Sequence, residues 1–312
     1  MTKRPKPGKL LNRTLMHAAA KLHYIEGLSQ VEVSRRMEVS TATVSRLLGL
    51  ARQEGIVRIQ VAELDEADVL GEKLCAALEL KAVRVVESDK AAALNSQVGS
   101  ILLGAGLRPG SVIAIGWGRT VQSVISAGLP KLPDVVVVPT TGGMHETASH
   151  FQINEFVRMA AEQTGGEARF LYAPSMVSSE LHAVLLRDPD AARLIGLWER
   201  VDAAILGIGL FQRDGVGADI GFATGEAGRV AGDVVRHYFD ADGNEMRWPG
   251  QDNLMSISRA QLRRVPLSIG AAIGREKAGA IIGAARSGMI NALVTDSRTA
   301  AQILDALQQP DV

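Results

Sequence analysis

Residues 29–52, SQVEVSRRMEVSTATVSRLLGLAR, have the pattern of two short helices joined by a tight turn. Ser29 and Glu32 have the spacing of a capping box, in which each side chain accepts a hydrogen bond from the backbone of the other residue. Val33 and Met37 lie four residues apart and therefore share one face. The first half of the stretch predicts a short capped helix with its apolar face turned inward.

The second half predicts a helix with one narrow buried stripe. Ser40 is a favourable N-cap, and apolar residues then recur at i, i+3, i+4 and i+7: Val44, Leu47, Leu48 and Ala51. The outward positions are left to Thr41, Ala42, Ser45, Arg46 and Gly49. Small side chains followed by one arginine allow a helix to lie close in the major groove of DNA, where arginine can read guanine. An ordinary amphipathic hairpin of a helical bundle is the alternative interpretation.

The distribution of charge favours the DNA interpretation. Residues 1–60 carry 11 Lys or Arg against 4 Asp or Glu, and the other residues carry 23 against 30, so a neutral chain has a basic head. Residues 14–26 add a helix that would complete a small core, with one face formed by Leu15, Ala18, Leu22 and Ile25. We expect base contacts from Thr41, Ser45 and Arg46, phosphate contacts from Ser29, Gln30 and Arg52, and a further DNA contact from Thr43.

The composition is that of a two-domain protein with a sizeable core. The chain has 312 residues, of which 46% are hydrophobic, with few aromatic residues and many glycines. Its one cysteine, Cys75, allows no internal disulfide and has no metal-ligand spacing, so we expect a small core residue on a helix there. No apolar run approaches 18 residues, and the basic N-terminus lacks an apolar segment. We therefore expect a soluble cytoplasmic protein without a membrane partner, metal or cofactor.

The chain divides into four predicted segments. Residues 1–12 are expected to form a disordered basic arm, which either touches DNA or only keeps the chain soluble. Residues 13–61 form an all-α helix-turn-helix domain, in which the alternating stretch from Ile56 onward is a wing or a connector. Residues 62–81 contain a linking or dimerisation helix. Residues 82–312 form a large second domain.

From residue 82 the sequence alternates short apolar runs with amphipathic helices. The expected strands are 82–86, 112–116, 135–139, 168–172, 203–209, 266–272 and 291–295, and the expected helices include 94–106, 119–127, 152–164, 277–287 and 297–308. Apolar strands separated by helices predict an α/β domain with a doubly wound, mostly parallel sheet covered on both faces. Ligands of such sheets bind beyond the carboxyl ends of the strands, so the loops there are the candidate site.

Three of these loops are rich in glycine. GWGRT (116–120) follows an apolar strand and opens a helix, so its backbone N–H groups and the helix dipole favour an anion. PTTGGM (139–144) places two hydroxyls and two glycines in a loop suited to phosphate or sugar hydroxyls. GIGLF (207–211) brings more backbone to the same edge. Glycines after strands also mark ordinary tight turns, but three such loops on one edge indicate a pocket.

Together these segments resemble the SorC family of bacterial sugar-responsive transcriptional regulators, within the wider group of the deoxyribonucleoside regulator and the central glycolytic gene regulator. The resemblance covers nearly the whole chain and is carried by LSQVEVSRRMEVSTATVSRLLGLARQEGIVRIQV, GWGRTVQSV, VVPTTGG, NEFVRMAAEQTGG, VDAAILGIG, GDVVRHYFDADG and REKAGAIIGAARSGMINALVTDSRTAAQIL. It implies a helix-turn-helix, winged or plain, and an effector domain similar to the sugar-phosphate isomerase and deaminase fold. It also implies a homodimer or homotetramer on double-stranded operator DNA.

The resemblance further implies which residues bind a sugar or sugar-phosphate effector: Gly116, Trp117, Gly118, Thr120, Thr140, Thr141, Gly142, Gly143 and Lys277. Lys277 would pair with a phosphate or carboxylate, or it is simply a solvated lysine at a helix start. Asp202, Asp233 and Asp240 could bond sugar hydroxyls, although the last two fit capping and turn positions equally well. Ala271, Ala272 and Ile273 stand where the family commonly has a glycine-rich run, which puts the identity of the ligand in doubt. Arg275 adds a second cation, which fits an anionic effector.

The rival interpretation is an enzyme, because the fold that the chain resembles hosts ketose–aldose isomerases and aminosugar deaminases. Those reactions need a base beside a carbonyl and an acid next to it. Only His145, Glu146 and His150 follow a predicted strand as a cluster that could supply them. A basic DNA-binding head has no purpose in such an enzyme, and an architectural DNA-binding protein would leave the large domain without a role. We therefore expect a ligand-controlled DNA-binding regulator that is not an enzyme.

Overall fold

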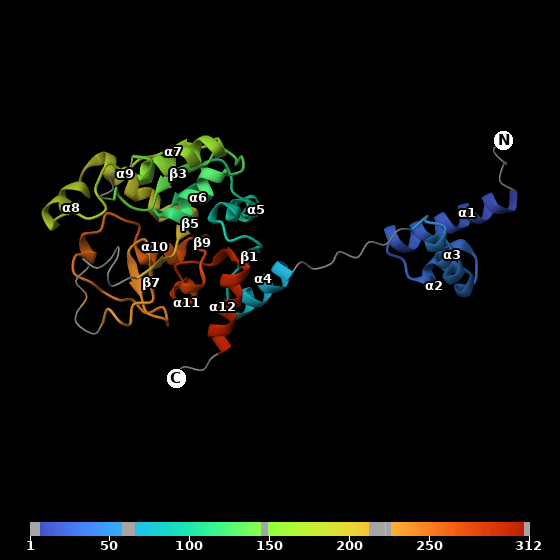
Figure 1. Ribbon diagram of the computed structural model, residues 1–312. Coiled ribbons are helices and arrows are strands. Elements are labelled where there is room, and N and C mark those ends of the chain that lie inside the picture. Colours follow the sequence, from blue (N-terminus) through green and yellow to red (C-terminus); the bar gives the residue numbers. More distant parts are fainter. Residues whose placement is uncertain (1–6, 58–65, 145–148, 212–221, 223–225, 309–312) are drawn as a thin grey trace. The chain divides into compact units, whose positions relative to one another are not determined.

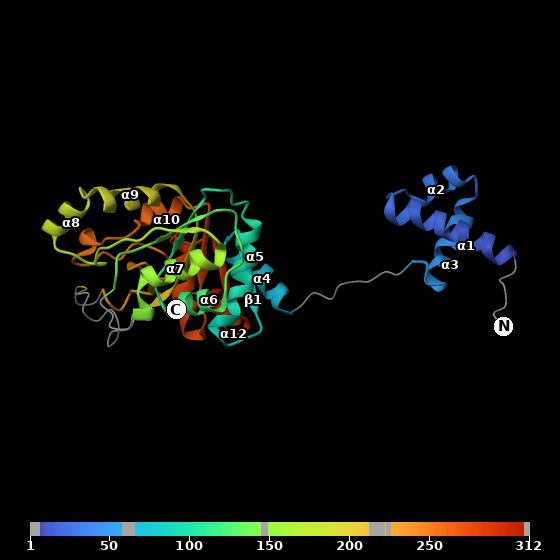
Figure 2. The ribbon, with the colours of Figure 1, turned by 90° about the horizontal axis from the view of Figure 1, so that it is seen from above.

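The protein consists of two compact units, Met1–Glu63 and Leu64–Val312, which Figure 1 and Figure 2 show from two directions. The structure is a computed structural model that describes residues 7–57, 66–144, 149–211, 222 and 226–308. Among these residues, no helix is long and apolar enough to cross a membrane.

The small unit is a helix-turn-helix with a core of its own. Its helices are α1 (Pro7–Ala20), α2 (Gln30–Met37) and α3 (Thr41–Gln53), and a π-helical turn, η1 (Lys21–Ile25), extends α1. Ser29 and Glu32 form the predicted capping box on α2, and Ser40 caps α3. The predicted stripe of α3 is confirmed, since all four of its apolar side chains are buried: Val44, Leu47, Leu48 and Ala51.

The first helix of the small unit differs from its prediction in length and in face. It begins at Pro7, so the expected disordered arm over residues 1–12 is wrong from Pro7 onward, and residues 1–6 lie outside the described part. Its buried face consists of Met16, Ala19 and Ala20, whereas Leu15 and Ile25 are exposed. Apolar residues occur on more than one side of this helix, and packing against α3 selects the side whose small alanines allow close approach.

The predicted strand after α3 does not begin where the alternation starts. Ile56 and Val57 follow the helix in a turn and pack against the core of the small unit, outside any strand. Their backbone N–H groups donate to the carbonyl of Ala51, 2.9 and 3.0 Å away, which continues the end of α3. Residues 58–65, where a wing or connector was expected, lie outside the described residues.

The large unit is built on a parallel sheet with the strand order β1-β10-β9-β5-β2-β3-β4. Its strands are β1 (Ala82–Val86), β2 (Val112–Ile115), β3 (Val136–Pro139), β4 (Glu167–Ala168), β5 (Val201–Gly207), β9 (Leu267–Ala271) and β10 (Ala292–Asp296). Every neighbouring pair is parallel, which confirms the predicted α/β fold. Successive side chains of β2 enter different cores on the two faces, as expected of a strand buried on both sides.

Helices cover both faces of this sheet (Figure 1). One face shares a core with α5 (Asn95–Gly104), α6 (Arg119–Ala127) and α7 (Ile153–Thr164). The other face shares a core with α4 (Glu66–Ala77), α9 (Pro189–Leu197), α10 (Arg259–Arg264), α11 (Ala278–Arg286) and α12 (Ser297–Gln308). Short 3-10 turns accompany them: η2 (Ala91–Leu94), η3 (Ser149–Phe151), η4 (Trp198–Arg200), η6 (Gln251–Asn253) and η7 (Arg275–Lys277).

Two parts of the large unit were not predicted. A small antiparallel sheet follows β5, with β6 (Gly209–Leu210), β7 (Gly232–Val234) and β8 (His237–Phe239). A cluster of aromatic rings packs edge to face beside it: Phe211, Phe222, Tyr238 and Trp248. A short helix, α8 (Ser179–Leu185), precedes α9.

Two predicted boundaries of the large unit are corrected. The strand expected over 168–172 is only Glu167–Ala168, because β4 is an edge strand whose ladder with β3 ends at Val137. The helix expected as a separate linker, α4, packs on β1 and α12, so the large unit begins at Leu64 rather than at residue 82. Cys75 is half-buried on this helix, as expected. A role of α4 in dimerisation stays a prediction.

Asp296 is expected to be the main polar support of the carboxyl edge near β10. Its carboxylate is buried and accepts hydrogen bonds from the backbone of Arg298 and Thr299, the Thr299 hydroxyl and the backbone of Gly274. Asp296→Ala should lower the unfolding free energy of the large unit by about 2 kcal/mol, because it removes a helix cap and leaves buried donors unpaired. Urea unfolding followed by tryptophan fluorescence measures this loss.

The fluorescence reports on the large unit alone, because the three tryptophans of the chain are Trp117, Trp198 and Trp248. Asp305→Ala is the matched control, since Asp305 lies exposed on the same helix, α12. It should change the unfolding free energy by less than about 0.5 kcal/mol. Equal losses in the two variants would contradict the role given to Asp296.

Candidate functional site

The candidate ligand site lies at the carboxyl edge of the sheet, where the strand order reverses. The chain passes from β2 to β3 on one side, whereas β5, reached later, pairs with the other side of β2. Open parallel sheets commonly bind ligands at such a point. The loops after β2, β3, β5 and β9 all end at this edge, and they contain most of the predicted effector-binding residues.

Two glycines shape the loop after β2. The backbone N–H of Gly116 donates to the carbonyl of Ile205 in β5 over 2.8 Å, and a Cβ on Gly116 would stand 3.0 Å from that oxygen. Gly118 has φ 138°, a conformation that favours glycine, and it immediately precedes α6. No side chain caps α6, so its first backbone N–H groups are left for solvent or a ligand. This geometry supports the anion-binding role predicted for GWGRT.

Trp117 and Thr120 differ in whether their polar side-chain group is available to a ligand. The indole Nε1 of Trp117 donates to the carbonyl of Phe151 over 2.8 Å, and the two rings meet edge to face. Trp117 therefore fixes the segment before α7, and only its ring remains for an effector. Thr120 is half-buried, and its hydroxyl has no hydrogen-bond partner among the described residues.

The loop after β3 is not the open cradle that its sequence predicts. Backbone N–H groups of Thr140, Gly142 and Gly143 donate to the carbonyls of Ile115, Met255 and Ala173 over 2.8–2.9 Å, so they are not available to a phosphate. The expected backbone cradle is therefore wrong at these three residues. Thr140 and Thr141 are 0% and 5% exposed, and the Thr141 hydroxyl donates to the carbonyl of Met255. The loop is buried because it threads between residues 173–175 and 254–257.

Lys277 is half-buried at the start of α11, which excludes the alternative of a fully solvated lysine. Its Nζ donates to the carbonyl of Ile208, just beyond β5, over 2.9 Å. Burial lowers the pKa of Lys277, the charge of Arg119 lowers it further, and Glu276 and Asp233 oppose this shift. The ammonium group is thus held at the switch point next to another cation.

Asp233 is the second carboxylate, after Glu276, whose charge acts on this lysine. One of its oxygens accepts a hydrogen bond from the backbone of Arg236 over 2.9 Å, and β7 places it opposite Gly209. Burial raises the pKa of Asp233, whereas the hydrogen bond from Arg236 and the charges of Arg236 and Lys277 lower it. Lys277 thus interacts with the charges of both Arg119 and Asp233, and we call these three residues the switch-point cluster.

Arg119 is the member of this cluster that sequence reasoning missed. It is the first residue of α6 and its side chain is exposed, with no ion-pair partner among the described residues. A cation is unfavourable at a helix N-terminus, where the helix dipole attracts negative charge. The position of Arg119 at a helix start, after two glycines, was the signal in the sequence.

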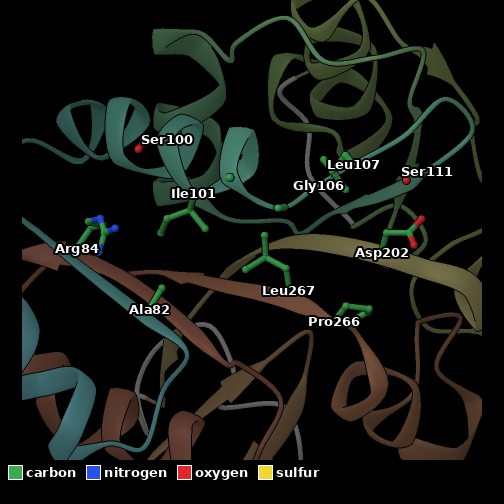
Figure 3. Close-up of a pocket in the computed structure, with 12 residues that line it drawn as sticks. Ala82, Arg84, Ser100, Ile101, Gly106, Leu107, Ser111, Asp202, Pro266 and Leu267 are labelled. Atoms are coloured by element: carbon green, nitrogen blue, oxygen red, sulfur yellow. The ribbon is translucent and has the colours of Figure 1, made fainter. Parts of the chain in front are cut away.

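Asp202 does not lie at this site, and its prediction is wrong. It is the second residue of β5, so it stands at the amino edge of the sheet, where its carboxylate accepts a hydrogen bond from the backbone of Val112 over 2.8 Å. It lines a cavity of about 400 Å³. Figure 3 shows Asp202 there together with Arg84 and Leu267. A residue that precedes a parallel strand emerges at the edge opposite to the residues that follow one.

Asp240 is a turn residue, which was the alternative given for it. It is buried after β8, and its Oδ1 accepts hydrogen bonds from the backbone of Asp242 and Asn244. Its Oδ2 lies 3.5 Å from the guanidinium of Arg229. These contacts use both carboxylate oxygens, so a sugar-binding role for Asp240 is not supported.

The cluster considered for an enzyme is only partly described. His145 and Glu146 lie outside the described residues, whereas His150 is exposed and its backbone carbonyl accepts a hydrogen bond from Gln122. Within the part of the chain that the structure describes, no group of three or more His, Cys, Asp or Glu side chains is placed to hold a metal ion.

The outward face of α3 is the candidate DNA-binding surface. Thr41, Ser45, Arg46 and Arg52 are exposed along it, and neither arginine has an ion-pair partner among the described residues. Thr43 is half-buried, and its hydroxyl bonds that of Ser40, so its role is in the helix cap. Ser29 and Gln30, the predicted phosphate-contacting residues at the start of α2, also differ in their exposure.

Ser29 is exposed but holds the capping box with its hydroxyl, and Gln30, the first residue of α2, is half-buried. A phosphate contact by Ser29 would therefore have to use the oxygen that already bonds Glu32. Contacts of these residues with DNA stay predictions, and the exposed arginines of α3 are the strongest candidates.

Comparison with known proteins bears on both units. Residues 63–305 match the family described as "Putative sugar-binding domain". The chain is 30% identical over 302 residues to the sorbitol operon regulator of Klebsiella pneumoniae, covering 91% of this chain and 96% of that protein. It is 26% identical over 302 residues to the deoxyribonucleoside regulator of Bacillus subtilis, covering 93% and 96%. The crystal structure of the full-length sorbitol operon regulator SorC from Klebsiella pneumoniae matches with a TM-score of 0.70 and 28% identity, covering 94% of this chain and 99% of that chain.

The two units define a class of protein in which a helix-turn-helix is joined to an α/β domain with a mostly parallel sheet. The chain belongs to the SorC family of sugar-binding transcriptional regulators. The resemblance inferred from the sequence segments is thereby confirmed, and it extends over both units.

Gly142 is expected to be the residue of the loop after β3 that tolerates substitution least. A Cβ there would stand 2.5 Å from the carbonyl oxygens of both Ala173 and Pro174. Gly142→Ala should therefore lower the unfolding free energy of the large unit by about 2–3 kcal/mol. Gly104→Ala is the control, since a Cβ at that helical position meets nothing within 4 Å and should leave stability unchanged or slightly raised. Comparable stability of both variants in urea would contradict the close packing of this loop.

Proposed function

We propose that this protein is a transcriptional regulator whose binding to operator DNA is controlled by a sugar phosphate or a related anionic carbohydrate. The observation that carries the proposal is the switch-point cluster, in which the half-buried ammonium group of Lys277 is exposed to the charge of a second cation, Arg119. An anion between these two cations would offset their mutual repulsion, and the uncapped start of α6 would donate backbone hydrogen bonds to it. Asp233 would bond a sugar hydroxyl.

The relatives agree with this class of ligand without naming the ligand of this chain. One relative is named for a sorbitol operon and another for deoxyribonucleosides. Sorbitol is a polyol, and a deoxyribonucleoside contains a sugar. The family matched by residues 63–305 is described as sugar-binding. An effector with several hydroxyls and one anionic group would therefore suit the switch-point cluster.

The proposed control acts through assembly on DNA. A homodimer or homotetramer would present paired α3 helices to a two-fold operator, and their spacing must match about one helical turn of DNA or a multiple of it. An effector that binds one packing of the subunits better than another shifts the balance between these packings. The operator affinity would change with that balance.

An enzyme remains the second candidate, because one observation favours it. Burial raises the pKa of Asp233 and lowers the pKa of Lys277, and such opposed shifts are typical of an acid–base pair. A binding site that awaits an anion shows the same shifts, and the relatives are named as regulators. Incubation with ketose and aldose phosphates, followed by product analysis, separates the two, since a regulator returns these compounds unchanged.

Arg46 is expected to read a base. Arg46→Ala should cost about 1–3 kcal/mol of binding free energy at one operator base pair and relax specificity there, because a bidentate contact to guanine is lost. Arg52→Ala serves as the comparison, since loss of a phosphate contact weakens binding to all sequences alike and reduces its salt dependence. Fluorescence anisotropy with a set of single-base operator variants measures both. A uniform loss for Arg46→Ala would exclude base reading.

Binding of the effector should be visible in the stability of the large unit. A ligand present at 100 times its dissociation constant stabilises the folded state by about 2.7 kcal/mol, so a thermal-shift screen of the full chain against free and phosphorylated sugars should give hits. Lys277→Met should abolish the shift and leave operator binding by the unliganded protein intact. Lys90→Met, which changes an exposed lysine, should keep the shift. Hits that survive Lys277→Met would place the ligand elsewhere.

A further inference from the structure

A cavity of the large unit lies at the amino edge of the sheet, opposite to the edge that carries the switch-point cluster. Its volume is about 400 Å³, within the range of roughly 300–1,000 Å³ that is typical of small-molecule sites. Residues at the starts of strands line it, together with the end of α5: Ala82 of β1, Ser111 before β2, Asp202 of β5 and Leu267 of β9. An effector bound at the carboxyl edge leaves this cavity unexplained.

Asp202 is presented to the cavity by a β-bulge. The register of β2 and β5 shifts between Val112 and Ile113, and Asp202 is the residue of β5 that is skipped. Its Oδ2 accepts a hydrogen bond from the backbone of Val112 over 2.8 Å, whereas its Oδ1 has no hydrogen-bond partner among the described residues. Bulges are frequent beside functional sites because they redirect a side chain. One carboxylate oxygen of Asp202 is thus left for a donor in the cavity.

Arg84 brings the opposite charge to the other end of the cavity. It lies in the middle of β1 with an exposed side chain, and its Nη1 donates to the carbonyl of Val83 over 3.0 Å. Figure 3 shows Arg84 and Asp202 at opposite ends of the group of lining residues. Within the described ranges, neither of them forms an ion pair with the other or with a third residue. Two unpaired charges of opposite sign therefore face the same space.

The wall between these two charges is apolar. Ile101, Leu107 and Leu267 are half-buried and pack against the core on this face of the sheet. Figure 3 shows Ile101 and Leu267 between Arg84 and Asp202. Because the core holds these side chains in place, the wall is preformed. Methylene groups lying on it would be removed from water, which favours binding.

The end of α5 favours a positive group in the cavity. The helix ends at Gly104, and Gly104, Ala105 and Gly106 all line the cavity. The last carbonyl groups of a helix have no partner within the helix, and they carry the negative end of its dipole. These carbonyls and the free oxygen of Asp202 are therefore acceptors of the kind that bind an ammonium group.

We propose that the amino-edge cavity binds a linear amino acid whose ammonium and carboxylate groups are separated by several methylene groups. The ammonium group pairs with Asp202, the carboxylate pairs with Arg84, and the methylene groups lie on Ile101 and Leu267. A sugar phosphate does not suit this arrangement, because it has no cation for Asp202. The proposal is independent of the proposed function, whose effector binds at the opposite edge of the sheet.

Isothermal titration calorimetry of the full chain with ε-aminocaproate tests the proposal. Saturable binding is expected. Hexylamine and caproate, which each carry one of the two charges, should bind at least about tenfold more weakly, because one charged partner is lost. Glycine should also bind at least about tenfold more weakly, since its two charges are too close together to reach both ends of the apolar wall.

Two variants assign the two ends of the ligand. Arg84→Gln should lower the affinity for ε-aminocaproate to that of hexylamine, because the carboxylate loses its partner. Asp202→Asn should lower it to that of caproate, and the amide oxygen can still accept the hydrogen bond from Val112. Arg187→Gln and Asp305→Asn are the matched controls, since each changes an exposed residue outside the cavity and should leave the affinity unchanged. Tryptophan fluorescence confirms that each variant is folded.

Three results would overturn the proposal: no saturable binding of ε-aminocaproate, equally tight binding of hexylamine, caproate or glycine, or an unchanged affinity in either Arg84→Gln or Asp202→Asn. Loss of binding in Lys277→Met would also overturn it, because the ligand would then lie at the carboxyl edge. Failure of the proposed function is a separate result. It appears as absence of operator or sugar binding and leaves the binding of ε-aminocaproate unaffected.

Discussion

The close approach of β2 and β5 beyond their last paired residues is the constraint on which the candidate ligand site depends. The backbone N–H of Gly116 donates to Ile205, and there is no space between the strands for a side chain at position 116. This contact fixes two segments. One is the loop after β2, which carries Arg119, and the other is the end of β5, where the carbonyl of Ile208 accepts the hydrogen bond from Lys277. Backbone contacts thus hold two cations near one another, and their mutual repulsion is available to favour an anion.

Features that depend on neighbours along the chain could be predicted from the sequence. The stripe of α3 and the capping box at Ser29 follow from spacings of three and four residues, and both are confirmed. The parallel strands could be predicted because strands buried on both faces are nearly continuous apolar runs. The buried face of α1 could not be predicted, because several faces of that helix are apolar. Only packing against α3 determines which of them is buried.

Features that depend on segments distant in the chain were missed or wrongly assigned. The loop Thr140–Gly143 has the composition of a phosphate cradle, but its N–H groups are taken by carbonyls that lie more than twenty residues away or at the end of β2. Asp202 was assigned to the wrong edge, although its place before an apolar run already fixes the edge. The small sheet β6-β7-β8 has strands too short for periodicity to mark.

The path of α4 suggests how the ligand site and the DNA-binding unit can communicate. The units have separate cores, so a ligand in one cannot act by completing the fold of the other. α4 ends at Ala77, a few residues before β1 starts at the amino edge, and it packs along β1. A helix that returns to a strand through so short a connection runs antiparallel to it, so the start of α4 lies toward the carboxyl edge. The first described residue of the large unit, Glu66, therefore lies toward the same edge at which the effector is proposed to bind.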